Sequence, residues 1–432
     1  NLKTLLGAAV AGGSLKKTDR DELLIRVGDA VCEDVLENSR INALGISLDA
    51  LRSEADLWSH YRLIMMLRAD IGFKRRVERL PNSSQCEARV ERGRGLFRPE
   101  LGKVLAFSKM YAYRRLIETP AGTPTELMGF IEGYFPKDVV KDHASELAGH
   151  MLFHEIAATV QVNHIVGRAG VEFIPATSAS LERGVSEVTA TYLLLEELLG
   201  IPALRKEIES LEGEVSTEVL YPALVELDEH LKRGVLALLS LRLESASLSW
   251  KADLAPAAAY IGSFIKDVRR MLPSESIDVI KGRKADWVKK GLPKALAKKI
   301  VYLGPITYLP AVCWWAGNEG LDLERAIRHF FYAGVHSGIS TLRGKISAQT
   351  YREKWDQLAV DSIDRALLSS LADIVRISVA QSEKPEDSAA FAHDSPLRRT
   401  VRSLEEFDDA RIPVSACFVL NERIRERIAN LH

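Results

Sequence analysis

The chain has 432 residues, a length that predicts two or three packed units rather than one core. Hydrophobic residues make up 47% and charged residues 27%, as in folded globular proteins, and 58 Lys plus Arg nearly cancel 59 Asp plus Glu. The net charge of -1 gives no overall field for a polyanion or an anionic membrane, so neither nucleic acid nor membrane partners are expected.

Cysteine usage and hydropathy further restrict the class of protein and the cellular compartment. No apolar run reaches the roughly 18 to 20 residues that a membrane span needs. The opening NLKTLLGAAV lacks an initiator Met and a basic leader, so we expect a segment of a longer polypeptide. A reducing, cytoplasmic location is favoured over a disulfide framework or a zinc knuckle, because no CxxC pair joins the four cysteines, Cys32, Cys86, Cys313 and Cys417.

Helical periodicity runs through the whole chain, and sustained strand alternation is absent. In residues 221–243, Leu224, Leu227 and Leu231 recur every three or four residues and define one helix face. Pro99 and Pro222 suit first-turn positions. The pattern predicts an all-α fold, a bundle-like array without substantial sheet, with helices in chain order at 19–34, 56–71, 99–117, 185–199, 221–243, 256–271, 357–378 and 414–428.

The first glycines only partly match a phosphate-binding loop. Residues 7–14, GAAVAGGS, nearly have the GxxxxGK[ST] spacing, yet Gly13 stands where the phosphate-contacting lysine is required. The preceding LKTLL has a helical pattern, so a helix end with a glycine cap is expected. Because residues 92–95, RGRG, lack the third glycine of a dinucleotide fingerprint, no NAD site is expected in this chain.

Two segments interrupt the helical pattern and are expected to be loops or linkers. Residues 79–95 contain Pro81 and the RGRG run, while residues 382–396 are polar, acidic and bounded by prolines. We therefore predict a helical segment over 1–94, a main helical domain over 95–381, and a mobile linker with a closing helix over 382–432.

Three histidines are the best metal candidates, although a structural role is favoured for them. His150 and His154 are four residues apart and are expected to share a helix face, with His164 further along. The zincin pattern HExxH is broken because Ala158 stands where its second histidine is needed. No catalytic, cofactor-binding or metal-binding residue is assigned.

One stretch resembles a family signature. Residues 95–101, GLFRPEL, and 105–109, LAFSK, resemble the GLxRPELxxLLAxxK pattern of large bacterial NAD-specific glutamate dehydrogenases. Phe153 and His154 depart from the family's usual two arginines, and Gly167 replaces an asparagine. Further matches follow in the family's order: Tyr134-Phe135-Pro136, Glu155-Ile156, Ala158-Thr159, Asn163, Val166, Arg168, Gly170, Gly291, Pro293, Leu296-Ala297 and residues 355–358.

The resemblance implies that this chain is the helical C-terminal region of such an enzyme. Its partner would be the catalytic domain of the same polypeptide, and residues 1–94 would follow the dinucleotide-binding domain. The intact enzyme would use NAD to convert L-glutamate and water to 2-oxoglutarate and ammonium, with formation of NADH. The family's active-site residues lie upstream, so none is carried over and this chain alone is expected to be inactive.

Two main hypotheses therefore stand, beside a third in which the chain is an independent enzyme with an unrecognised site. In the first, the chain is a non-catalytic part of a cytoplasmic, homo-oligomeric glutamate dehydrogenase and acts in domain packing, subunit assembly or regulation. In the second, it is a stand-alone helical protein-interaction module without enzymatic activity. Arg98 and Lys109, in the signature helix, are expected to support assembly or turnover, unless both charges only orient their own helix.

Overall fold

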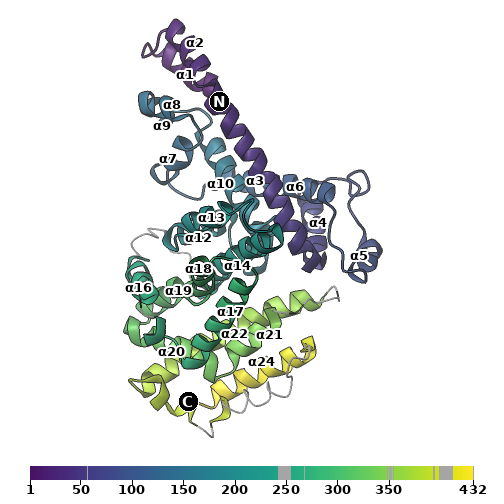
Figure 1. Ribbon diagram of the computed structural model, residues 1–432, viewed down its shortest axis with the longest axis vertical. Helices are drawn as coiled ribbons and strands as arrows, with labels where there is room; N and C mark the ends of the chain where they lie inside the picture. The colour runs from purple at the N-terminus through teal and green to yellow at the C-terminus, as the bar shows by residue number, and fades with distance from the viewer. Residues whose placement is uncertain are drawn as a thin grey trace. The chain divides into compact units, whose positions relative to one another are not determined.

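A computed structural model shows the protein as an assembly of helices (Figure 1). It describes residues 1–55, 57–241, 254–266, 268–347, 349, 353, 355–392, 395–397 and 412–431. No strand forms among these residues, where the sole bridge joins Glu212 and Val215. The all-α prediction is confirmed.

The chain divides into two compact units, Asn1–Leu193 and Leu194–His432, with the division inside α12 (Val185–Leu198). The boundaries expected near residues 95 and 382 stay predictions. The first unit contains α1 (Leu2–Ala11), α2 (Lys17–Arg26), α3 (Gly28–Ala55), α4 (Leu57–Ile71), α5 (Ser83–Val90), α6 (Arg98–Glu118), α7 (Pro124–Glu132), α8 (Lys137–Asp142), α9 (Ala144–Ala148), α10 (Phe153–Ala169) and α11 (Phe173–Leu181).

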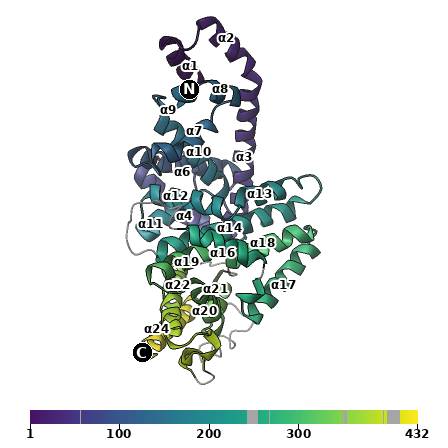
Figure 2. The same ribbon diagram turned by 90° about the vertical axis from the view of Figure 1, so that its left-hand side faces the viewer.

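The first unit has its apolar core at two places along α3. At the beginning of this helix, Leu5, Leu6 and Leu23 from α1 and α2 pack with Ile131 and Phe135 of the α7 region. Toward its end, α3 packs against α4, α6 and α10. Figure 2 shows the long α3 ribbon running from α2 at one end to the α4 region at the other.

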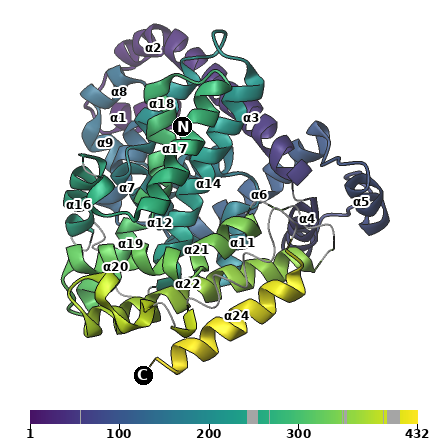
Figure 3. The same ribbon diagram turned by 60° about the horizontal axis from the view of Figure 1, so that its bottom comes forward.

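The second unit is built around two long helices, α14 (Thr217–Leu241) and α22 (Asp356–Gln381). α14 packs against α13, α18 and α19, while α22 packs against α20 and α24, and Figure 3 shows α24 lying along α22. Its other helices are α13 (Ile201–Glu209), α16 (Ala255–Lys266), α17 (Ser274–Lys289), α18 (Lys294–Ile306), α19 (Leu309–Asn318), α20 (Leu323–His336), α21 (Ile339–Ser347) and α24 (Val414–Ala429).

Most predicted helices form, with several differences in their bounds. The helix expected over residues 19–34 is two helices, because the chain turns at Val27 and buries that side chain in the core. Within the expected loop 79–95, α5 begins with reciprocal hydrogen bonds: the N–H of Gln85 donates to Asn82 Oδ1 at 2.8 Å, and the N–H of Asn82 to Gln85 Oε1 at 2.9 Å.

The proline predictions differ in outcome. Pro99 lies in the first turn of α6, as predicted. The prediction for Pro222 is wrong, because α14 begins earlier, at Thr217, and contains this proline in its interior. The Ser216 hydroxyl marks the start instead, accepting the N–H of Glu218 at 3.2 Å. The helix end expected at the first glycines is confirmed, since α1 ends at Ala11 with Gly12 as its cap.

Part of the segment expected to be a linker is packed. Residues Pro385–Asp387 and Ala389–Phe391 form short 3₁₀ helices, η2 and η3, and another 3₁₀ helix, η1, covers Val268–Arg270. Phe391 is buried and meets the Tyr332 ring edge-on at 5.2 Å. The expected mobility of this linker stays a prediction.

One described stretch departs from the expectation that no segment is long and apolar enough for a membrane span. Lys294–Asn318, which comprises α18 and α19, reaches a mean hydropathy of 1.2. Since 67% of this window is buried within the structure, it also has the character of core helices, which satisfy the same length and composition test. This stretch is therefore only weak evidence for a membrane-spanning helix.

Candidate functional site

Three buried polar residues near the end of α3 form the centre of a contact that we call the α3 junction: Asp49, Arg52 and Ser53. Asp49 and Arg52 are one helical turn apart, and Arg52 Nη1 donates to Asp49 Oδ1 at 2.9 Å. Their side chains are only 1% and 5% exposed. Charges removed from water in this way require further hydrogen bonds to offset their desolvation.

The α3 junction receives those hydrogen bonds from the end of α10. Arg52 Nη2 donates to the Arg168 carbonyl at 2.7 Å, and the N–H of Val171 donates to Asp49 Oδ2 at 3.2 Å. Gly170 has a φ of 96°, and a Cβ added there would lie 2.6 Å from Asp49 Oδ1. The matched residues Arg168 and Gly170 are therefore explained by backbone geometry around a buried ion pair.

The signature segment enters the same junction. Ser53 Oγ accepts the N–H of Leu96 at 3.0 Å, and a Cβ added to Gly95 would lie 2.2 Å from that Oγ. On α6, Leu101 and Ser108 are buried, and Ser108 donates to the Val171 carbonyl at 2.5 Å. The first glycine of the signature thus permits close approach to α3.

The signature glutamate fixes the start of α6. Glu100 accepts the N–H of Phe97 at 2.8 Å and binds the Arg89 guanidinium through both oxygens, at 2.7 and 2.9 Å. Arg89 also lies over the Phe97 ring, 4.3 Å from its centroid. Glu100 therefore links α5 to the first turn of α6.

Arg98 and Lys109 both bind α3. Arg98 Nη1 donates to Ser47 Oγ, and Lys109 Nζ donates to Asn42 Oδ1, each at 2.8 Å. Burial lowers the pKa of the Lys109 ammonium to about 8. These contacts lie within the first unit and favour a structural role for both charges.

Gly167 also has a structural explanation. A Cβ added to Gly45 of α3 would lie 2.9 Å from the Gly167 carbonyl, and one added to Gly167 would lie 3.0 Å from Ile41. Two glycines therefore allow α3 and α10 to pack closely.

The histidines do not lie as predicted. His150 and His154 do not share a helix face, because α10 begins only at Phe153, after a turn at Gly149. His150 is buried and accepts the Leu152 N–H at 3.0 Å, while His164 Nδ1 lies 2.9 Å from Arg168 Nη1. No group of three metal-ligating side chains gathers within the described parts of the chain.

Two buried histidines in the second unit serve in helix packing. Glu226 accepts from Arg283 at 2.6 Å and Trp287 at 3.1 Å and lies 3.3 Å from His230, which ties α17 to α14. Burial lowers the pKa of His230. His329 Nδ1 lies 2.7 Å from Ser378 Oγ, a pairing that resembles an activated nucleophile, but both residues are 0% exposed and a substrate has no access.

Three cysteines are equally inaccessible. Burial raises the pKa of Cys86 and Cys417 to about 11 and that of Cys313 to about 12, so their thiols are poor nucleophiles at neutral pH. Cys32 is exposed, and all four cysteines are free. No nucleophilic site can be built on these three buried thiols.

The first half of α3 exposes apolar side chains to solvent. Residues 31–40, which we call the open α3 segment, are all exposed and extend over nearly three helical turns. They include Val35 at 59% and Leu36 at 70% exposure. An isolated helical stretch of this length is marginal in water, so burial against a partner would stabilise it.

Comparisons with known proteins agree with the resemblance. The chain is similar to proteins named NAD-specific glutamate dehydrogenase from Halomonas elongata, Pseudomonas aeruginosa and Mycobacterium tuberculosis, at 24%, 23% and 23% identity. These matches cover 94%, 83% and 95% of this chain but 25%, 22% and 25% of the respective relatives. The chain thus spans about a quarter of the length of the curated relatives it matches.

A family model covers the larger part of the chain. The family described as "Glutamate dehydrogenase, C-terminal" matches residues 93–426, from just before the signature to the last turn of α24. The match includes Gly95, Glu100 and Gly170, whose contacts with α3 and α5 are described above. The chain therefore belongs to the glutamate dehydrogenase C-terminal family.

Proposed function

We propose that this chain is the non-catalytic helical part of an NAD-dependent glutamate dehydrogenase. The intact, cytoplasmic and homo-oligomeric enzyme would convert L-glutamate, water and NAD to 2-oxoglutarate, ammonium and NADH. This chain would contribute contacts that support domain packing, subunit assembly or regulation. The family match and the names of the relatives support the assignment to this enzyme class.

The observation that carries the contact role is the open α3 segment. A helix that exposes Val35 and Leu36 along nearly three turns loses the burial that stabilises most helices. The relatives are about four times longer than the region they share with this chain. We assign the partner that covers this segment to the remaining part of the same polypeptide. The segment precedes residues 93–426, which match a family described as C-terminal, so in sequence it lies on the side of the rest of the enzyme.

Introducing a charge into this surface should lower the activity of the intact enzyme and leave the stability of the 432-residue chain nearly unchanged. In Val35→Asp, an aspartate would be buried at the contact without a partner, so we expect the rate of NADH formation by the full-length protein to fall tenfold or more. The melting temperature of the 432-residue chain should change little, because Val35 is 59% exposed. Steady-state rates, light scattering and thermal unfolding measure these effects.

Val279→Asp is the matched control, since Val279 is also helical, in α17, and is 62% exposed. It should leave the rate and the subunit mass unchanged. If Val35→Asp has the same rate and mass as the wild type in the full-length protein, the open α3 segment is not a contact surface.

A further inference from the structure

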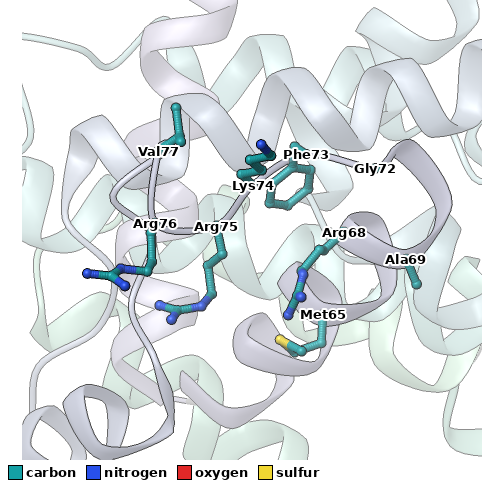
Figure 4. A pocket seen from close by; sticks show the side chains of 9 residues that line it. All are labelled: Met65, Arg68, Ala69, Gly72, Phe73, Lys74, Arg75, Arg76 and Val77. Carbon is teal, nitrogen blue, oxygen red and sulfur yellow. The ribbon is translucent and has the colours of Figure 1, made fainter.

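A cavity of about 820 Å³ lies where α4 ends and the chain turns toward α5. This volume is within the range of small-molecule sites in proteins. None of its lining residues is acidic, and four are cationic: Arg68, Lys74, Arg75 and Arg76. Figure 4 shows Arg68, Arg75 and Arg76 on one side of the turn and Lys74 on the other.

The positive charges of the cavity are not neutralised by the protein. Arg68 and Arg76 make no side-chain hydrogen bond or ion pair with any residue that the structure describes. The nearest acids along the chain are engaged elsewhere: Asp70 pairs with Arg115, and Glu78 lies 3.4 Å from Lys103. The cavity therefore has an uncompensated positive potential, although the chain as a whole carries a net charge of -1.

The turn that presents these cations is held in place from both ends. The Phe73 ring stacks on Phe107 of α6, with centroids 4.1 Å apart and planes 4° apart. Arg75 Nη1 donates to the carbonyl of the buried Leu80 at 2.7 Å, and Lys103 Nζ donates to the Glu78 carbonyl at 2.5 Å. Guanidinium groups on a fixed backbone bind an anion with less loss of conformational entropy than groups on a free loop.

We propose that this cavity binds a small, multiply charged anion that carries phosphate or carboxylate groups. The planar forks of Arg68, Arg75 and Arg76 suit the oxygens of either group, and Met65 and Phe73 add apolar lining. The site belongs to the first unit alone and does not depend on the enzymatic role proposed for the intact protein.

Isothermal titration of the chain with inorganic triphosphate, and separately with a tricarboxylate, tests the site. The wild type should bind at least one of the two saturably with one-to-one stoichiometry, and the preferred anion identifies the chemical group. The double variant Arg68→Gln and Arg76→Gln should raise the dissociation constant tenfold or more. Its melting temperature should not change, because neither side chain has a partner among the described residues.

The control removes the same charge elsewhere. Arg269 and Arg270, of η1 in the second unit, are exposed, and their double replacement by Gln should leave binding at the wild-type level. The proposal is overturned if neither anion binds the wild type saturably. It is also overturned if both double variants weaken binding equally, since net charge rather than the cavity would then govern affinity.

Discussion

Asp49→Ala is expected to lower the free energy of unfolding of the first unit by about 3–5 kcal/mol, the usual cost of removing one partner from a buried ion pair. The variant would remove the Asp49 carboxylate from the Arg52 guanidinium, which is 5% exposed and also donates to the Arg168 carbonyl. The N–H of Val171 would lose its acceptor as well. The α3 junction would therefore lose the Asp49–Arg52 ion pair and the hydrogen bond from Val171 together.

Scanning calorimetry measures this effect as a fall of roughly 10 °C in the melting transition of the first unit. Glu37→Ala is the matched control, because Glu37 and Arg40 form a pair on the same helix with the same spacing, but their side chains are 53% and 43% exposed. The control should cost less than about 1 kcal/mol. Equal losses in the two variants would show that burial does not determine the contribution of the Asp49 pair.

Gly95→Ala is expected to destabilise the first unit by about 2–4 kcal/mol. The added methyl would lie 2.2 Å from Ser53 Oγ and 2.6 Å from the Ser53 carbonyl carbon, so the backbone of α3 or of the signature segment must move. Overpacking of this kind costs about 1–3 kcal/mol, and the hydrogen bond from the Leu96 N–H to Ser53 contributes about 1 kcal/mol more. Urea unfolding of the chain measures the loss.

Gly102→Ala, seven positions further along the same signature, should have the opposite sign. Gly102 is inside α6, and a Cβ there would meet only Ile46 Cδ1 at 3.9 Å, an ordinary contact. Alanine should therefore stabilise α6 by about 0.5–1 kcal/mol. A Gly95→Ala variant as stable as the wild type would contradict the close approach to Ser53.

The sequence predicted helices best where one apolar face is buried along the whole element. α6, α12, α22 and α24 agree with their predicted positions within three residues at each end, while α14 begins four residues before its predicted start, and residues 242–243 of its predicted range lie outside the described residues. Most of α3 was not predicted, for two physical reasons. Residues 31–40 are all exposed and so show no periodic apolar face, while Asp49, Arg52 and Ser53 place polar side chains at buried positions. Tertiary contacts offset the cost of burying these three polar side chains. The pattern of a single helix does not reveal such contacts.

The candidate sites were harder to predict than the fold. The signature marked the segment that meets α3, but its partners Asp49 and Ser53 lie more than 40 residues away in the chain. A run of basic residues at 74–76 is present in the sequence, yet tertiary contacts such as the stacking of Phe73 on Phe107 place it at a cavity. The helix face predicted for His150 fails because the chain turns at Gly149 before α10 begins.

The polar and ionisable groups of the chain described above lie either in the packed interior or on exposed surfaces. The buried histidines, cysteines and ion pairs serve the fold, while the open α3 segment and the basic cavity face solvent. We propose that the chain contributes to a glutamate dehydrogenase through contacts made by such exposed surfaces.

Glutamate-dependent NADH formation, measured for the 432-residue chain and for the full-length polypeptide at equal concentrations, tests the proposed role most directly. A non-catalytic part of the enzyme predicts turnover by the full-length protein and no rate above the protein-free blank for the chain alone. Sustained turnover by the purified chain, or a full-length protein that does not oxidise glutamate with NAD, would contradict that role.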